Sequence, residues 1–511
     1  MEILIFLKFD NANLSAKNFY ARHKRRKFME AFIGHVNDAL YGYVLIILLV
    51  VGGIYFTIRT KGAQFNIAKQ IGAVIGKPSD GKKVSSFQAL MVSTASRVGT
   101  GNIIGVTTAI MMGGFGSVFW MWVIALIGGA SALVESTLAQ IFKTKTEKGF
   151  VGGPAYYIEK GLGKKWKWLA VLFSVLLILT YAVGFNMLCS YNLQSTFATY
   201  EFYGTLTVNG YNFMPWVIGF IIAVLVAICI LGGGKGIIKV TSFLVPFMGV
   251  TYILVALIVT CMHITALPSV IAQIFAGAFD FNAIFGGFMG SCIMHGVKRG
   301  LYSNEAGIGS APNAAATADV SHPVKQGLVQ TLSVFIDTIL ICSATAFMCM
   351  TSGVDPAPFG DNAAGYIQAA LSVSLGGFGP IFITTAMVLF AFTTLVGNLY
   401  YVDQAVYHLL GKTPSKAFTI VYRILSALLV FVGSGLSVSL LWGIADVTMG
   451  LMALINIPVI AVLGKYAYKA ISDYNKQKKE KKEPVFTPST IGLSNLDGWQ
   501  ESTTNDVELE Q

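Results

Sequence analysis

The amino-acid sequence predicts an all-α membrane protein that crosses the bilayer about eleven times. Two features of composition support this fold class, because 54% of the 511 residues are hydrophobic and only 12% are charged, whereas a soluble domain averages about 25% charged residues. The third observation is a series of apolar runs, most of them long enough for a helix that spans the hydrocarbon core. The predicted spans are residues 40–58, 86–112, 117–141, 168–192, 215–231, 241–262, 284–301, 328–350, 377–402, 417–435 and 439–463.

The distribution of basic residues predicts the orientation of these spans. When the flanking helix turns are counted, every lysine and arginine in the connections follows an odd-numbered span, and seven more follow the last span. Because cytoplasmic loops are enriched in lysine and arginine, we expect these connections and the C-terminus in the cytoplasm, and the N-terminus outside. The protein is thus expected in the plasma membrane, and its net charge of +11 needs no nucleic-acid partner.

One segment disagrees with this orientation. Residues 22–27 read Arg-His-Lys-Arg-Arg-Lys and would lie outside. Either the first span is misjudged or residues 1–28 are absent from the mature protein, and we favour the second interpretation, with Met29 as the start. The charged composition at the other end of the chain is typical of disorder. We therefore expect a basic extension (1–28), a leading helix with a cytoplasmic loop (29–84), a core of ten helices (85–470) and a disordered cytoplasmic tail (471–511).

The second span contains a break in an otherwise apolar helix. Its middle reads Gly99-Thr100-Gly101-Asn102, and two glycines beside a hydroxyl and an amide weaken a helix. Irregular backbone at membrane depth is tolerated only where it is buried in protein or lines a cavity. The half-helices that meet there offer N–H groups to an anion and carbonyls to a cation, as secondary transporters do for a carboxylate and its coupling ion. We interpret the break as the binding site of a transporter.

The seventh span carries a similar interruption, at Gly286, Gly287 and Gly290. Spans two to eleven divide into two sets of five, and the two glycine-broken spans open the two sets. Such a pair indicates an inverted-repeat transporter. The run Gly99–Gly105 is also close to a dinucleotide fingerprint, but that motif needs a soluble βαβ unit. Helix packing through small residues is a further alternative, although packing alone does not call for Asn102.

Several ionisable residues lie at or near the interior of spans, where such groups are costly in lipid and usually face the bundle interior or a cavity. Arg97 precedes the break by two residues, and we expect Glu135 or Asp337 to be its acidic partner. A structural ion pair and a gating role both remain open for these residues. Arg299 to Glu305 is expected to begin a cytoplasmic loop, where an inner-gate role is an alternative.

Five stretches carry a resemblance to a known family: Ser96–Val106, Gly152–Ile158, Arg299–Pro312, Phe335–Thr338 and Phe392–Thr394. They are similar to the signatures of the alanine or glycine:cation symporter family, and the resemblance runs from about Met29 to Lys469. The family implies the leucine-transporter fold, in which one leading helix precedes a five-plus-five inverted repeat. It also implies sodium-driven uptake of small neutral amino acids, with sodium as the coupling ion and no other cofactor.

The resemblance also implies roles for individual residues. Backbone amides around Thr100 and Gly101 would hold the substrate carboxylate, and Asn102 would offer its side-chain oxygen to sodium or substrate. Carbonyls of the first half-helix and hydroxyls of the ninth span would form a sodium site, and a hard cation prefers oxygen ligands. The implied substrate-binding residues are Gly99, Thr100, Gly101, Asn102, Cys189, Phe288, Thr394, Leu395 and Asn398, and the implied sodium ligands are Ala95, Val98, Asn102, Thr393 and Thr394.

Two of these positions depart from the family pattern. Cys189 stands where the family typically has glutamine, and Asn398 stands where it typically has tryptophan. Loss of an indole leaves room for a longer side chain, and Asn398 adds donors and an acceptor that a methyl group cannot satisfy. The expected substrate is a small neutral amino acid such as alanine or glycine, and the alternative is a larger polar one such as glutamine, asparagine or serine.

Two other functional classes are disfavoured. A membrane enzyme would need a catalytic constellation, but only His295 among six histidines lies well inside a span, and neither a Ser-His-Asp nor an H-E-x-x-H pattern occurs. The six cysteines form no C-x-x-C pair, so neither a zinc site nor a disulfide framework is expected. A channel would not saturate as a transporter does, and two broken helices fit alternating access better.

Overall fold

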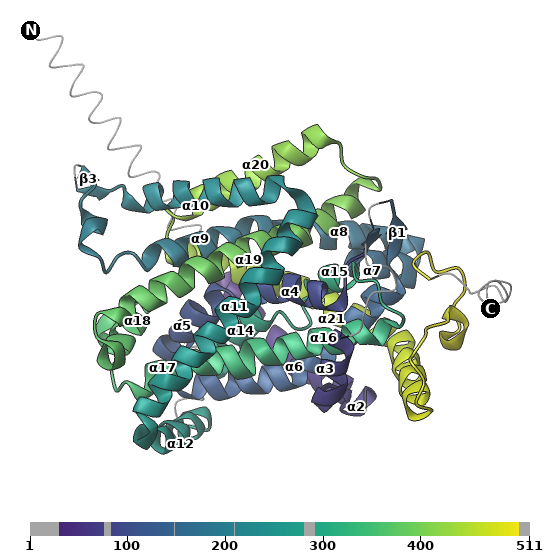
Figure 1. Cartoon of the computed structure of the whole chain (residues 1–511), viewed down its shortest axis with the longest axis horizontal. Helices are drawn as coiled ribbons and strands as arrows, with labels where there is room; N and C mark the ends of the chain where they lie inside the picture. The colour runs from purple at the N-terminus through teal and green to yellow at the C-terminus, as the bar shows by residue number, and fades with distance from the viewer. Residues whose placement is uncertain (1–29, 76–82, 148, 209, 281–291, 500–511) are drawn as a thin grey trace, which may run out of the picture.

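A computed structural model of the chain describes residues 30–75, 83–147, 149–208, 210–280 and 292–499. Within this part the protein is a bundle of long helices that run roughly parallel or antiparallel to one another (Figure 1). Nine continuous helices in the described part are long and apolar enough to cross a membrane: Glu30–Arg59, Gly116–Ile141, Lys164–Ser195, Met214–Leu231, Gly233–Met262, Pro323–Thr351, Phe378–Leu410, Lys416–Gly433 and Val438–Lys479.

Several of these helices contain π-helical turns, which divide them into labelled pieces. The first includes η1 (Leu40–Val44) and α2 (Leu45–Arg59). The fourth span comprises η4 (Lys164–Trp166), α8 (Lys167–Ile178), η5 (Leu179–Phe185) and α9 (Asn186–Ser195). The eighth comprises α16 (Pro323–Phe335), η9 (Ile336–Cys342) and α17 (Ser343–Thr351). The undivided helices are α6 (Gly116–Ile141), α10 (Met214–Leu231), α11 (Gly233–Met262), α19 (Phe378–Leu410), α20 (Lys416–Gly433) and α21 (Val438–Lys479).

Two further segments are discontinuous. One consists of α4 (Ser86–Arg97), η3 (Gly101–Gly105) and α5 (Val106–Gly113), and the other of α14 (Cys292–Asn304) and α15 (Pro312–Ala315). With the nine continuous helices they make eleven, and they occupy the second and seventh places along the chain. The predicted fold class, eleven spans with a broken helix at the start of each set of five, is confirmed.

Short elements lie at the two ends of the bundle. The end that carries the even-numbered connections includes α12, α18 and the hairpin β3–β4, whereas β1–β2, α7 and the C-terminal residues lie at the opposite end (Figure 1). These short elements are η2 (Ala63–Phe65), α3 (Ile67–Ile75), β1 (Thr144–Thr146), β2 (Gly149–Val151), α7 (Pro154–Leu162), η4 (Lys164–Trp166), η6 (Glu201–Gly204), β3 (Thr207–Val208), β4 (Tyr211–Asn212), η7 (Ile264–Ala266), α12 (Leu267–Ala278), η10 (Ala357–Phe359), α18 (Ala363–Leu375) and η11 (Pro488–Ile491).

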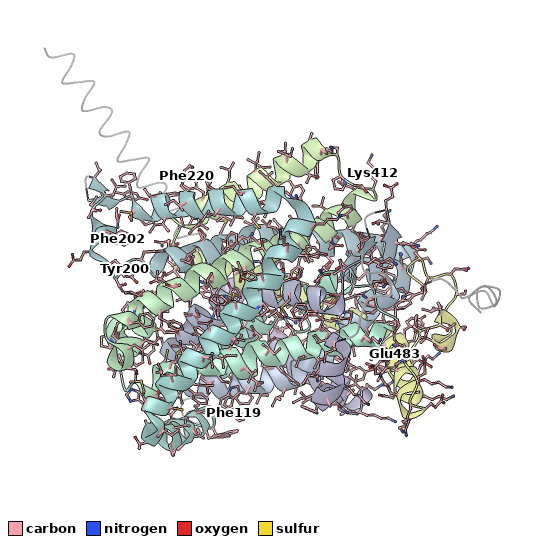
Figure 2. The ribbon with its side chains drawn as sticks, in the orientation of Figure 1. Phe119, Tyr200, Phe202, Phe220, Lys412 and Glu483 are labelled. Atoms are coloured by element: carbon pink, nitrogen blue, oxygen red, sulfur yellow. The ribbon has the colours of Figure 1, made fainter. Side chains whose placement is uncertain are left out.

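Burial separates inner helices from outer ones. In α6 and α19, 67% of the most apolar stretch is buried, whereas α10, α11 and α20 bury only 28–33%. The outer helices display large apolar side chains such as Phe220, which points away from the bundle (Figure 2). In a membrane protein such a surface faces lipid. The inner helices α6 and α19 pack directly against the two discontinuous segments, so the broken backbone lies inside the protein.

The C-terminal residues differ from the expectation of a disordered tail from residue 471. Helix α21 continues to Lys479, and the following residues fold back onto the protein, where Phe486 and Ile491 are buried. A few well-placed apolar side chains are sufficient to anchor this charged segment, because each large side chain contributes roughly 1.5–3 kcal/mol when fully buried. The prediction is therefore wrong for residues 471–499.

Candidate functional site

The first break lies at Val98 and Gly99, where the predicted weak stretch begins. Helix α4 ends because Val98 leaves the helical region, with φ −76° and ψ 88°. Asn102 holds the restart of the helix: its side-chain Oδ1 accepts from the N–H of Gly99 at 2.8 Å, and its own N–H donates to the Gly99 carbonyl at 3.2 Å. The N–H groups of Thr100 and Gly101 have no acceptor among the described residues. They form the positive end of a half-helix.

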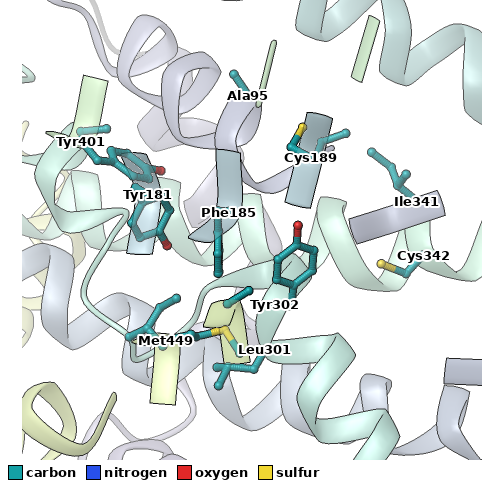
Figure 3. Close-up of a cluster of buried hydrophobic side chains, with 14 of the residues drawn as sticks. Ala95, Tyr181, Phe185, Cys189, Leu301, Tyr302, Ile341, Cys342, Tyr401 and Met449 are labelled. Carbon is teal, nitrogen blue, oxygen red and sulfur yellow. The ribbon is translucent and has the colours of Figure 1, made fainter. Parts of the chain in front are cut away.

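Glycines let two other helices approach this break closely. A Cβ atom on Gly99 would lie only 1.9 Å from Oγ1 of Thr394, which is on α19, and one on Gly101 would lie 2.9 Å from the ring of Tyr302, which is on α14. Tyr302 extends toward Cys189 of α9 beside Phe185 (Figure 3). The break is therefore enclosed by α9, α14 and α19, and Thr100 is fully buried.

The second break follows α14. Glu305 has φ 56°, and Gly307 and Gly309 have φ 86° and 85°, so three residues of the connection to α15 adopt the left-handed conformation that favours glycine. This connection was not predicted as a break. The predicted interruption, at Gly286, Gly287 and Gly290, lies outside the described residues.

The prediction that Arg299 to Glu305 begins a cytoplasmic loop is wrong. Arg299 is only 5% exposed and Glu305 is fully buried. The guanidinium of Arg299 is compensated by Asp446 of α21, with nitrogen–oxygen distances of 3.0 and 3.3 Å, and it lies 3.7 Å from the ring centre of Trp442. Because its charge is paired inside the bundle, Arg299 needs no aqueous loop.

Side chains link the two breaks directly. Glu305 accepts from Ser96 of α4 at 3.0 Å and from Ser310, beyond the second break, at 2.8 Å. Oδ1 of Asn398 also lies 2.5 Å from the Ser96 hydroxyl, and its Nδ2 donates to Asn186 of α9 at 2.8 Å. Ser96 and Glu305 therefore connect the two breaks through side-chain contacts.

Asp337 forms a second link between the breaks. Its Oδ1 accepts from Nδ2 of Asn102 at 2.7 Å, and its Oδ2 accepts from the hydroxyls of Ser303 on α14 and of Thr338 at 2.8 and 2.9 Å. Asp337 is fully buried. Asp337 thus connects the start of the second half-helix at Asn102, the end of α14 and η9 through one carboxylate.

Arg97 does not pair with either predicted acidic partner. Its Nη1 donates to the carbonyl and to the side-chain oxygen of Gln330, at 3.2 and 3.1 Å, and its Nε and Nη2 have no partner among the described residues. Glu135 instead accepts from the N–H of Gly307 and from Asn456, at 3.2 and 2.8 Å. The predicted partners are wrong because other donors already hold both carboxylates: a backbone N–H and an amide hold Glu135, and an amide and two hydroxyls hold Asp337.

The residues expected to bind sodium lie on facing helices. The hydroxyl of Thr394 donates to the Ala95 carbonyl at 3.1 Å, and the Val98 carbonyl accepts no hydrogen bond from the described residues. Thr393 lies differently: its hydroxyl donates to the Leu389 and Phe390 carbonyls of its own helix, both at 3.0 Å. Neighbouring positions on a helix point about 100° apart, so only Thr394 contacts the break.

Helix α9 contributes polar groups that the sequence did not single out. Nδ2 of Asn192 donates to the Thr100 hydroxyl at 3.3 Å, while Oδ1 of Asn192, Nδ2 of Asn186 and Oγ of Ser190 have no partner among the described residues. Cys189, fully buried on the same helix, is directed to the Ala391 carbonyl at 3.5 Å. The signal available in the sequence was that Asn186, Ser190 and Asn192 lie within three residues of the predicted substrate residue Cys189.

Two other predicted substrate residues remain. Leu395 is buried beside Thr394, and Phe288 lies outside the described residues.

A model of the sodium:alanine symporter family matches residues 26–488, which is most of the chain. The protein belongs to the sodium:alanine symporter family. The members of this family couple amino-acid transport to sodium. This chain is accordingly a multi-pass membrane protein for sodium-coupled amino-acid transport. The membership confirms the resemblance carried by the sequence stretches around the two breaks.

Curated relatives cover nearly the whole chain. The amino-acid carrier protein AlsT of Bacillus subtilis is 44% identical, over 93% of this chain and 98% of the relative. The probable sodium/glutamine symporter GlnT of the same organism is 42% identical, over 94% and 98%. The sodium/alanine symporter AgcS of Methanococcus maripaludis is 35% identical, over 88% and 98%. Among solved structures, a sodium-coupled sialic acid symporter has 14% identity and a TM-score of 0.45, over 86% of each chain.

Proposed function

We propose that the protein is a plasma-membrane symporter that takes up a neutral amino acid together with sodium, and that it is neither an enzyme nor a channel. The observation that carries this proposal is the first break, where N–H groups and a carbonyl oxygen without hydrogen-bond partners in the described part of the chain lie within a few residues of each other. One end suits an anion and the other a cation. The basic connections and the C-terminus face the cytoplasm in this proposal, and the N-terminus lies outside.

The two binding functions divide between the half-helices. The N–H groups of Thr100 and Gly101 hold the substrate carboxylate at the start of the second half-helix. The carbonyls of Ala95 and Val98, with the hydroxyl of Thr394, hold sodium at the end of the first. Both assignments draw on the Thr100 and Gly101 N–H groups and the Val98 carbonyl, which have no partner among the described residues, and on the 3.1 Å contact between Thr394 and the Ala95 carbonyl. Carboxylate and cation then lie close enough to favour each other's binding.

The side-chain pocket is proposed to accept a polar group. Asn398 takes the place of an indole in the family pattern, and Asn186 and Asn192 each present a buried amide atom without a partner among the described residues. A buried polar atom left unsatisfied costs about 1–3 kcal/mol. A substrate amide or hydroxyl removes that cost, whereas the methyl group of alanine does not. Glutamine, asparagine and serine are therefore the proposed preferred substrates.

A competition experiment tests this preference. Sodium-driven uptake of labelled alanine is measured in proteoliposomes with each common amino acid as a competitor. Glutamine, asparagine or serine should compete at lower concentration than glycine does. The variant Asn192→Leu should raise the inhibition constant of the polar competitors about tenfold, as expected for loss of roughly 1.4 kcal/mol, with a smaller change for alanine.

The control for this experiment lies on the same helix. Gln194 is also buried, but its side chain bonds the Tyr203 hydroxyl, at 2.6 Å, away from the break. Gln194→Leu should leave the order of competitors unchanged. The preference for polar substrates is refuted when alanine and glycine compete best and Asn192→Leu affects all competitors equally.

A further inference from the structure

The last described part of the chain, residues 480–499, packs across one end of the bundle and is called the C-terminal strap below. It lies at the end that carries β1 and α7 (Figure 1), and Glu483 marks its start in Figure 2. This is the end of the basic connections, which the proposed function assigns to the cytoplasm. The strap contacts the connection between α15 and α16, and therefore the segment that follows the second break.

Direct pairing joins the strap to this connection. The N–H of Phe486 donates to the Ser321 carbonyl at 2.9 Å, and the Ser321 hydroxyl donates to the Pro484 carbonyl at 2.7 Å. Glu483 forms an ion pair with Lys325 at the start of α16, and the hydrogen bond from this lysine lowers the pKa of the Glu483 carboxyl. Phe486 also packs edge-on against His322, with ring centres 5.5 Å apart.

The far end of the strap is fixed to α6. The indole N–H of Trp499 donates to the carbonyl of Gln140 at 2.9 Å. The side chain of Gln140 donates in turn to the carbonyls of Ala315 and Ala318, at 2.5 and 2.9 Å. The end of α15 is thereby held against α6 directly beneath the strap.

Lys143 completes this contact. Its ammonium lies 4.6 Å from the ring centre of Trp499 and 3.9 Å from that of Phe150, and it donates to the Ala318 carbonyl at 3.1 Å. Burial of the ammonium lowers the pKa of Lys143 to about 7. Lys143 is therefore shielded from water by Trp499 of the strap together with Phe150 and the Ala318 carbonyl.

A transporter that alternates between two sides must open a path from the breaks to each side. In the described residues, the short helix α15 is the helix that follows the second break. Gln140 and Lys143 hold α15 and the connection after it against the end of α6, and Ser321 holds that connection against the strap. We propose that the C-terminal strap is a latch on the inner side of the transporter, which must release the α15–α16 connection before the second break opens to the cytoplasm.

Two opposite changes test the latch, and both rest on the proposed transport function. Phe486→Ala with Trp499→Ala removes the two rings that anchor the strap. A reporter cysteine is placed at Ala318, which is fully buried, in a background with Cys261→Ser and Cys229→Ser. In inside-out vesicles, release of the strap should raise the labelling rate of the reporter by a membrane-impermeant thiol reagent at least tenfold. Maximal uptake should change at least threefold, with the half-saturating sodium concentration unchanged.

The matched control is Trp166→Ala, which removes an exposed indole at the same end of the molecule. Among the described residues, the Trp166 ring stacks on Trp168 and on no ring of the strap, so labelling and uptake should remain at the level of the parent protein. Limited proteolysis after Lys481 reports whether the strap has left the surface. A protein whose strap is cleaved while labelling and uptake stay unchanged would refute the latch.

The opposite variant ties the strap down. Cysteines at Ser321 and Phe486, whose backbones are already paired, form a reversible bridge when oxidised. Oxidation should stop uptake, and reduction should restore it, while sodium-dependent binding of labelled substrate from the outer side persists. Uptake at the parent rate in fully bridged protein overturns the proposal. If the parent protein itself shows no sodium-dependent binding of substrate, the transport function is contradicted instead.

Discussion

Replacing Gly99 with alanine should lower the rate of sodium-driven uptake at least about 100-fold. The added Cβ would lie 1.9 Å from Oγ1 of Thr394, which is too close for any real contact, so either the break or α19 must move. A misplacement of about 1 Å at a binding site is sufficient for a loss of this size. Both proposed ligand sets are displaced together, and the affinities for sodium and for the amino acid should fall in parallel.

Gly105, which lies beyond the break at the end of η3, provides the control. A Cβ atom there would lie 3.8 Å from the Tyr302 ring, which is an ordinary van der Waals distance. Alanine also has a higher helix propensity than glycine. Gly105→Ala should transport within about twofold of the parent, because a change of 0.4 kcal/mol corresponds to roughly that factor. The close-approach explanation is wrong if both variants transport alike at equal expression and equal thermal stability in detergent.

Replacing Thr394 with alanine should raise the sodium concentration for half-maximal uptake by roughly 10- to 100-fold. The expected size follows from the loss of one oxygen ligand to a cation, since a hydrogen bond to a charged group contributes about 1.5–3 kcal/mol. Thr394→Ser keeps the hydroxyl and should restore most of the sodium affinity. Maximal uptake at saturating sodium should change less than the affinity does.

Thr393→Ala supplies the matched comparison, because this neighbouring hydroxyl bonds the Leu389 and Phe390 carbonyls of its own helix. Its sodium dependence should stay within about threefold of the parent, as for loss of a local hydrogen bond worth less than 1 kcal/mol. If the sodium concentration for half-maximal uptake rises equally in the two variants, both threonines ligate sodium. No shift in either would remove α19 from the sodium site.

The overall fold was predictable because the bilayer restricts what a chain can do. Spanning segments must satisfy their own backbone groups, so hydropathy and basic residues identify helices with little ambiguity. The first break was predictable for the same reason, since Gly99 and Gly101 beside Asn102 contradict the demand for a strong helix. These signals are local in sequence and need no knowledge of distant contacts.

The errors have the opposite origin, because each depends on a distant partner. Arg299 was placed in a loop since its compensating carboxylate, Asp446, lies 147 residues away. The second break was missed because Gly307 and Gly309 follow a charged residue, Glu305, which Ser96 and Ser310 satisfy only after folding. Charge counted along the sequence cannot reveal which charges are paired in space.

The tail shows the same limit at the surface of the protein. Its composition resembles that of disordered segments, yet Phe486 and Trp499 contact each other with ring centres 4.9 Å apart and are held by the ends of α6 and α16. A prediction from composition averages over the segment, whereas two aromatic anchors determine its position. The polar atoms of Asn186 and Asn192 were missed similarly, because an asparagine on a helix reveals nothing about its partners.

Uptake of a labelled neutral amino acid by proteoliposomes with a defined ion gradient tests the central proposal most directly. An inward sodium gradient should drive saturable accumulation above equilibrium, and collapse of that gradient should release the substrate. The same vesicles in equal potassium, with an inward proton gradient, should show no accumulation. Accumulation that persists without sodium, or flux that does not saturate, would contradict sodium-coupled symport by this protein.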